Sequence, residues 1–155
     1  MTSIPTAVVL ALTLAAADSL ASPAAAQGRS IEDTKTIDSY RLTMPVLRKV
    51  LPALYAPGAQ SCPREKDRDP NSLSIAAMTR SLERCAPGMQ ALSRAGVPAW
   101  EAAIVFGSLL RTGQRVAMQA GKESALPLGV VRDNALLLEH NDPEIRKLTK
   151  PGAEA

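Results

Sequence analysis

Few side chains in this sequence could carry chemistry, and the first to consider are its two cysteines, Cys62 and Cys85. The sequence has no C-x-x-C motif and no histidine near either residue, which disfavours a redox or metal site. Two thiols in an exported protein usually pair. We therefore predict a structural disulfide, worth roughly 3 kcal/mol in the chain-entropy model, that anchors the highly charged segment 63–70.

The single histidine, His140, belongs to a second group of candidate residues. Together with Asp142 and Glu144 it has the atoms for a metal or acid–base site. A histidine near a helix C-terminus also favours the helix dipole, and Asn141 or Asp142 is suited to cap the next helix. Because metal sites usually recruit ligands from separate elements, we favour the capping interpretation and predict no metal, no cofactor and no catalytic set. A metal-dependent enzyme around His140 is the least favoured alternative.

The first 26 residues are typical of a secretory signal peptide. An apolar run over residues 7–17 is too short to span a bilayer, and Ala24 and Ala26 stand where a signal peptidase reads small residues. Residues 1–6 contain no lysine or arginine, which departs from the usual charged start. We predict cleavage after Ala26, a periplasmic or secreted protein, and no transmembrane span in the remainder.

Helices must position these groups, and the longest candidate covers residues 97–121. Its small and apolar residues recur every three or four positions, which is the period of a buried helix face. The expected inward stripe consists of Ala99, Ala103, Phe106, Leu110, Gly113, Ala117 and Ala120, widened by Ala102, Val105, Leu109 and Val116. The expected outward face includes Ser108, Arg111 and Thr112, with Ile104 as an apolar exception.

Shorter helices are predicted on both sides of this central helix. Thr43 and Ser74 are suited to begin two of them, and Pro87 fits the first turn of a third that Gly96 ends. Pro52 lacks an N–H, so we expect a kink or an early end near Leu51. Further helices are predicted over residues 131–140 and from residue 143, and no segment predicts a strand.

The expected fold is therefore all-α: a single small helical bundle of five to six helices around the long central helix, with no sheet. The expected organisation is a signal peptide over residues 1–26, a disordered segment over 27–38, a helical domain over 39–150 and a tail over 151–155. Asn134 is predicted to point inward and to bond a backbone group.

Two glycines lie inside the central helix, where each lowers helix stability by about 1 kcal/mol relative to alanine. Gly107 and Gly113 indicate either close helix packing or space for a ligand, and we favour packing. Methionines are adaptable apolar side chains that could line such a space. The candidate apolar pocket comprises Met44, Met78, Trp100, Phe106, Gly107, Leu110, Gly113 and Met118.

The composition narrows the range of partners. The formal net charge is +3, which is too weak for nucleic acid, and the few aromatic residues offer no platform for stacked bases. The remaining partners are a protein of the cell envelope or a small apolar ligand. We favour a non-enzymatic exported binding or structural module, with a carrier of a small apolar ligand as the alternative.

Two short motifs carry a resemblance. The run from Tyr40 to Met44 leads into a helix, and Leu126-Pro127-x-Gly129-Val130 precedes Asn134 and a closing helix. In these motifs the chain resembles small exported all-helical proteins of unknown function from environmental bacteria, over about residues 38–148. It departs from them in its cysteine pair and in the charged segment 63–70. The resemblance implies an exported helical domain and brings no activity.

Overall fold

The computed structural model describes residues 29–59, 62, 74–119 and 126–150. Over these ranges the protein has seven helices and no strand. The all-α prediction is therefore confirmed, and the number of helices in these ranges exceeds the predicted five to six by one. The helices are α1 (Ile31–Ser39), α2 (Met44–Leu54), α3 (Ile75–Glu83), α4 (Ala86–Arg94), α5 (Ala99–Met118), α6 (Val130–His140) and α7 (Asp142–Leu148). The predicted signal peptide and tail lie outside the described residues.

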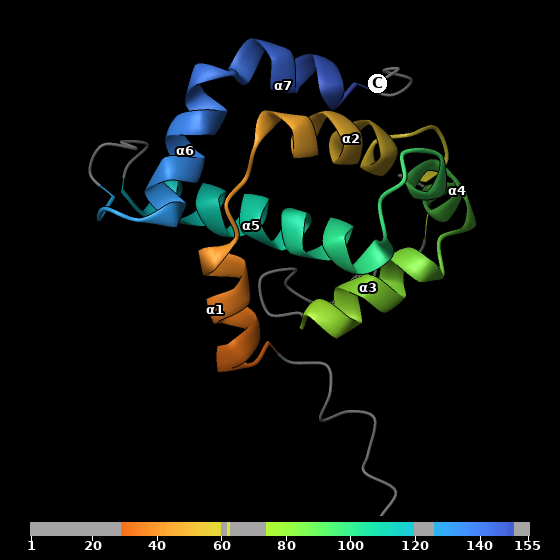
Figure 1. The fold of residues 1–155 in the computed structure, drawn as a ribbon, viewed down its shortest axis with the longest axis horizontal. Coiled ribbons are helices and arrows are strands. Elements are labelled where there is room, and N and C mark those ends of the chain that lie inside the picture. The colour runs from red at the N-terminus through yellow and green to blue at the C-terminus, as the bar shows by residue number, and fades with distance from the viewer. Residues whose placement is uncertain (1–28, 60–61, 63–73, 120–125, 151–155) are drawn as a thin grey trace, which may run out of the picture.

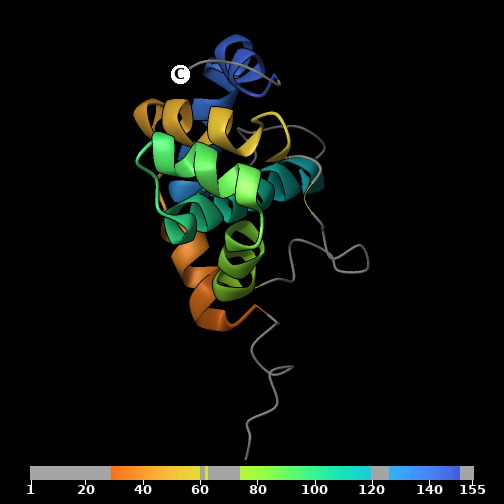
Figure 2. The same cartoon turned by 90° about the vertical axis from the view of Figure 1, so that its right-hand side faces the viewer.

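The long helix α5 runs through the middle of the bundle (Figures 1 and 2). Helices α2 and α7 lie on one side of it, and α1 and α3 lie on the other. The main buried core lies between α2, α4 and the first half of α5 and is closed by apolar side chains of α6 and α7. A smaller core of Ile37, Met78 and Ala103 joins α1, α3 and α5.

Helix α1 corrects the expectation of a disordered segment over residues 27–38. Ser30 caps it: its Oγ accepts from the N–H of Asp33 at 3.0 Å, while the Asp33 carboxylate accepts from the N–H of Ser30. This reciprocal capping box satisfies two backbone donors that would otherwise be unpaired. Ile37 then anchors the helix, since it is only 1% exposed.

Helix α2 corrects the expectation placed on Pro52. The helix begins after Thr43 as predicted, but it continues through Pro52 to Leu54. A proline removes one helical hydrogen bond, here in the last turn, but beyond it the N–H of Tyr55 still donates to the Leu51 carbonyl at 3.0 Å. The end of α2 therefore stays helical and presents Leu54 beside Leu51.

The predicted beginnings of the later helices agree with the structure. Ser74 caps α3 by accepting from the N–H of Ala77, and Pro87 lies in the first turn of α4. Gly96 follows the end of α4 with a φ of +66°, a conformation that glycine adopts without steric cost. At α7 the cap position belongs to Asn141, whose side chain makes no capping bond and donates instead to the Leu137 carbonyl.

The buried face of α5 differs from the predicted stripe. The first half of the helix is buried on nearly every side, including Ile104 and Ser108, whereas in the second half Thr112 is buried and Gly113 and Ala117 are exposed. Small and apolar residues occur all round this helix, so periodicity alone does not fix its rotation. The Ser108 hydroxyl is satisfied inside the protein, because it donates to the Ile37 carbonyl at 3.1 Å.

Gly107 lies where side chains of α1 and α3 pack against α5. A Cβ at this position would lie 2.9 Å from Ile37 Cδ1 on α1 and 3.3 Å from Met78 Cε on α3. The first distance is shorter than real Cβ contacts and the second is tight, so close packing explains this glycine, as predicted.

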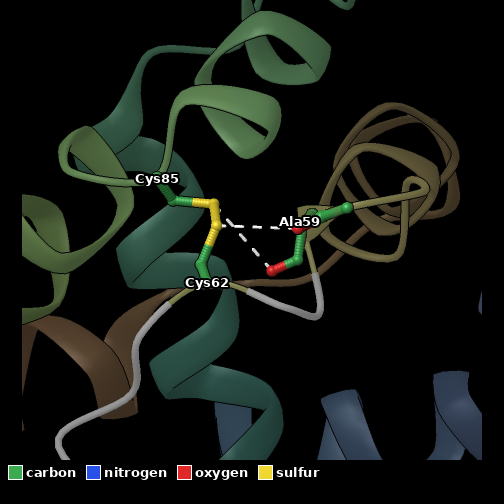
Figure 3. The surroundings of a disulfide bond; sticks show 4 residues. Ala59, Cys62 and Cys85 are labelled. Carbon is green, nitrogen blue, oxygen red and sulfur yellow. Dashed lines mark hydrogen bonds between the residues drawn. A yellow bond between two sulfur atoms is a disulfide. The ribbon is translucent and has the colours of Figure 1, made fainter.

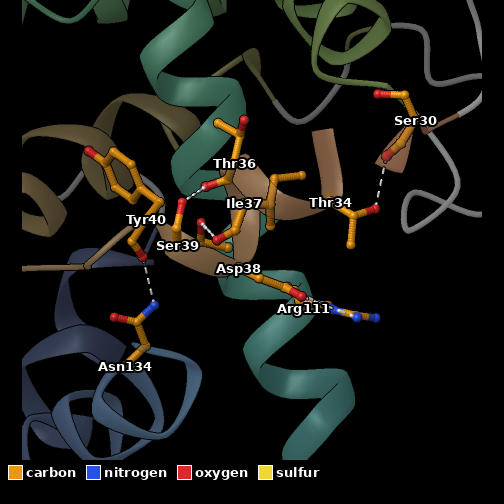
Figure 4. A network of polar contacts seen from close by, with 10 residues as sticks. Ser30, Thr34, Thr36, Ile37, Asp38, Ser39, Tyr40, Arg111 and Asn134 are labelled. Atoms are coloured by element: carbon orange, nitrogen blue, oxygen red, sulfur yellow. Dashed lines mark hydrogen bonds and ion pairs between the residues drawn. The ribbon is translucent and has the colours of Figure 1, made fainter. Parts of the chain in front are cut away.

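Polar contacts fasten the extended link between α1 and α2 to the rest of the bundle (Figure 4). The Asn134 side chain accepts from the N–H of Leu42 at 2.8 Å and donates to the Tyr40 carbonyl at 2.9 Å. Asn134 is only 2% exposed, so the predicted inward contact with a backbone group is confirmed. Nearby, Arg111 on α5 forms a two-pronged ion pair with Asp38 on α1, with Nε and Oδ1 2.9 Å apart.

Candidate functional site

An apolar groove of about 500 Å³ lies between the end of α2 and the middle of α5. Its walls come from α2 and α5, which the main core holds together. The lining residues are Leu51, Leu54 and Tyr55 on the α2 side and Phe106, Leu109, Leu110, Gly113 and Gln114 on α5.

The groove has an exposed apolar wall on α5. Phe106 is 36% exposed, and Leu110 is half-buried. Gly113 has open space above it, because no atom would lie within 4 Å of a Cβ placed there. None of the lining residues carries a formal charge at neutral pH. The groove is therefore suited to neutral apolar groups rather than to an ion.

The structure divides the predicted pocket residues into three sets. Phe106, Leu110 and Gly113 come together in the groove. Met44, Met78 and Gly107 belong to the two cores, so they face other side chains instead of a ligand space. Trp100 and Met118 lie on the surface outside the groove lining, with 56% and 70% of their surface exposed.

The α2 wall of the groove was missing from the sequence-based pocket. Leu51 and Leu54 continue one helical face through the proline, and Tyr55 follows directly after the helix. That spacing identifies an apolar face, but it does not show which residues of the face border open space rather than the core.

The two cysteines lie at disulfide distance, with their Cα atoms 5.5 Å apart, and no other cysteine occurs in the chain (Figure 3). Cys85 is buried at the start of α4, and its sulfur lies 3.9 Å from the Ala59 carbonyl oxygen. A Cβ on Gly88 would lie 2.9 Å from this sulfur, so glycine makes room for the bridge. The cysteines thus lie as the predicted pairing requires, but Cys85 stands at the beginning of α4 instead of on the preceding helix. The charged segment 63–70 that the bridge was expected to anchor lies outside the described residues.

The residues around His140 do not come together as a ligand set. Asp142 accepts from Arg146 Nε at 2.6 Å, and Glu144 accepts from Arg48 Nε at 2.6 Å. The hydrogen bond from Arg48 holds the pKa of Glu144 below its ordinary value. His140 itself is exposed in the last turn of α6, where its ring lies at the negative end of the helix dipole.

Tyr40, on the link between α1 and α2, also has a shifted pKa. Burial raises the pKa of the Tyr40 phenol, and the neighbouring Glu101 carboxylate raises it further through its charge and a hydrogen bond. Tyr40 is half-buried beside the main core, so its neutral form is part of the packed link between α1 and α2.

Among the described residues, no group of three or more His, Cys, Asp or Glu side chains could hold a metal ion. Within the same ranges, no helix combines the length and the apolar character needed to cross a membrane.

Comparison of the chain with protein-family models, with curated proteins and with solved structures found no match. The resemblance to exported helical proteins therefore stays a prediction.

Proposed function

We propose that this protein is an exported, non-enzymatic binding module that holds apolar side chains of a protein partner in the α2–α5 groove. The observation that carries the proposal is the stripe of Phe106, Leu110 and Gly113. Its composition is that of a buried helix face, yet it borders an open groove. Apolar anchors that enter such a groove at helical spacing are a common mode of protein recognition.

Export is the second part of the proposal. It is supported by the predicted signal peptide and by the Cys62–Cys85 pair, since disulfides persist mainly in oxidising compartments. The partner is accordingly expected in the cell envelope or outside the cell.

The alternative function is carriage of a small apolar ligand. It is favoured by the volume of the groove, about 500 Å³, which falls within the range of small-molecule sites. Against it, the methionines expected to line a ligand cavity, Met44 and Met78, pack in the cores.

Site-directed photo-crosslinking in the exporting cell tests the proposal. A benzophenone amino acid replaces Gln114, which lines the groove, or Gln90, a glutamine on α4 that is also exposed and serves as the matched control. We expect a protein adduct at position 114 and none at position 90. An adduct of small-molecule mass would transfer the assignment to the carrier function, and equal labelling at both positions would refute a specific groove.

A further inference from the structure

We propose that the occupant of the groove is α5 of a second copy of this chain, in an antiparallel pair whose two-fold axis passes between Leu109 and Leu110. This inference rests on the proposed binding role of the groove and names the partner. A two-fold dimer uses the same surface on both copies, so that surface must be complementary to itself.

The spacing along α5 provides this self-complementarity. Phe106 and Gly113 are seven residues apart, which is close to two helical turns, so they share one face. Each lies three and a half residues from the midpoint, or about 5 Å along the axis at 1.5 Å per residue. In an antiparallel pair centred there, Phe106 of each copy therefore faces Gly113 of the other.

The shapes of these two residues match. Phe106 is the bulky, partly exposed side chain of the groove wall, and Gly113 leaves open space where a side chain would stand. The ring of one copy can thus enter the gap above Gly113 of the other and lie against that copy's Leu54 and Tyr55. Two such contacts form at once, one on each side of the axis.

The charge pattern also permits self-association. A two-fold axis brings each residue close to its own copy, so a charged groove would repel itself. The α5 residues that line the groove are all neutral. The nearby Arg111 is turned to α1, where it pairs with Asp38, and Arg115 follows it by four residues on the same side of the helix.

Sedimentation equilibrium of the exported, disulfide-bonded protein tests the inference. We expect a dimer for the wild type. Leu110→Glu and Leu110→Lys should each raise the dimer dissociation constant by about 100-fold or more, because like charges meet near the axis. An equimolar mixture of the two variants should associate again, and Gln119→Glu, at the exposed end of α5, serves as the charge control.

A second variant keeps the test decisive if the Leu110 variants fail to fold. Gly113→Val adds a side chain where the single copy has open space, so it should preserve the helix content and melting behaviour while it weakens the dimer. A wild type that is monomeric at high concentration, or a dimer that all of these variants leave intact, would overturn the inference. If position 114 then crosslinks to a different protein, the proposed function stands without self-association; if it crosslinks to nothing, both proposals fall.

Discussion

Replacement of Asn134 by alanine should lower the free energy of unfolding by about 3 kcal/mol. The side chain satisfies two main-chain groups of the link between α1 and α2, the N–H of Leu42 and the carbonyl of Tyr40. A buried donor that loses its partner costs about 1–3 kcal/mol, and the loss of a second hydrogen bond adds about 1 kcal/mol. Alanine offers neither a donor nor an acceptor, so both groups are left unpaired.

The assay is urea unfolding followed by far-ultraviolet circular dichroism, with Asn141→Ala as the matched control. Asn141 donates only to the Leu137 carbonyl, four residues earlier on the same helix, so its loss should cost about 0.5 kcal/mol or less. The Asn134 variant should also melt about 10 °C lower, and the amide of Leu42 should exchange its hydrogen faster.

The isosteric change Asn134→Asp separates the two bonds. A carboxylate can still accept from the N–H of Leu42, but it can no longer donate to the Tyr40 carbonyl. We expect it to destabilise the protein as well. The reasoning would be refuted if Asn134→Ala and Asn141→Ala cost the same, because the inward clamp would then contribute nothing beyond a local helix contact.

The other predictions concern packing, the disulfide and pH. Gly107→Val should lower the free energy of unfolding by about 2 kcal/mol or more through overpacking. Gly113→Val should change the stability of the single copy by no more than about 0.5 kcal/mol. Thermal melts at low protein concentration compare the two variants, and equal losses would contradict the assigned contacts. Reduction of the Cys62–Cys85 pair should lower the free energy of unfolding by roughly 3 kcal/mol, measured by urea unfolding with and without dithiothreitol; a double serine variant should show the same loss and no response to the reductant. The raised pKa of Tyr40 means that the folded state holds the phenol proton more tightly than the unfolded state, so this contribution to stability is complete below pH 10 and is lost as the pH rises above it. Tyr40→Phe should flatten that alkaline loss in a series of melts, and identical pH profiles for variant and wild type would exclude the effect.

Local signals in the sequence were sufficient for most helix boundaries. Ser74, Pro87 and Gly96 each act through their own backbone geometry, and each marks a boundary in the structure. Helix α1 was not predicted because it buries a single residue, Ile37, so its sequence shows little apolar periodicity. Its Ser30-x-x-Asp33 capping box was the one available signal.

The groove was harder to predict because it depends on the rotation of one helix and the length of another. Phe106, Leu110 and Gly113 were correctly grouped on one face of α5, but the sequence could not show that this face turns away from the core. That choice depends on contacts such as the Ser108 hydroxyl with α1, which only the assembled bundle provides. The other wall, Leu51, Leu54 and Tyr55, was missed because helical spacing does not tell which apolar residues at the end of α2 border open space.

The Asn134 clamp also has a consequence for the timing of biosynthesis. Its partners Leu42 and Tyr40 precede it by 92 and 94 residues, so they leave the ribosome long before it. At roughly 5–20 residues per second, the delay is about 5–20 s. During that interval the Leu42 N–H and the Tyr40 carbonyl lack their Asn134 partner and are left to water. A product truncated before α6 would never gain that partner, so its link between α1 and α2 would stay exposed, a feature that cellular proteases can recognise.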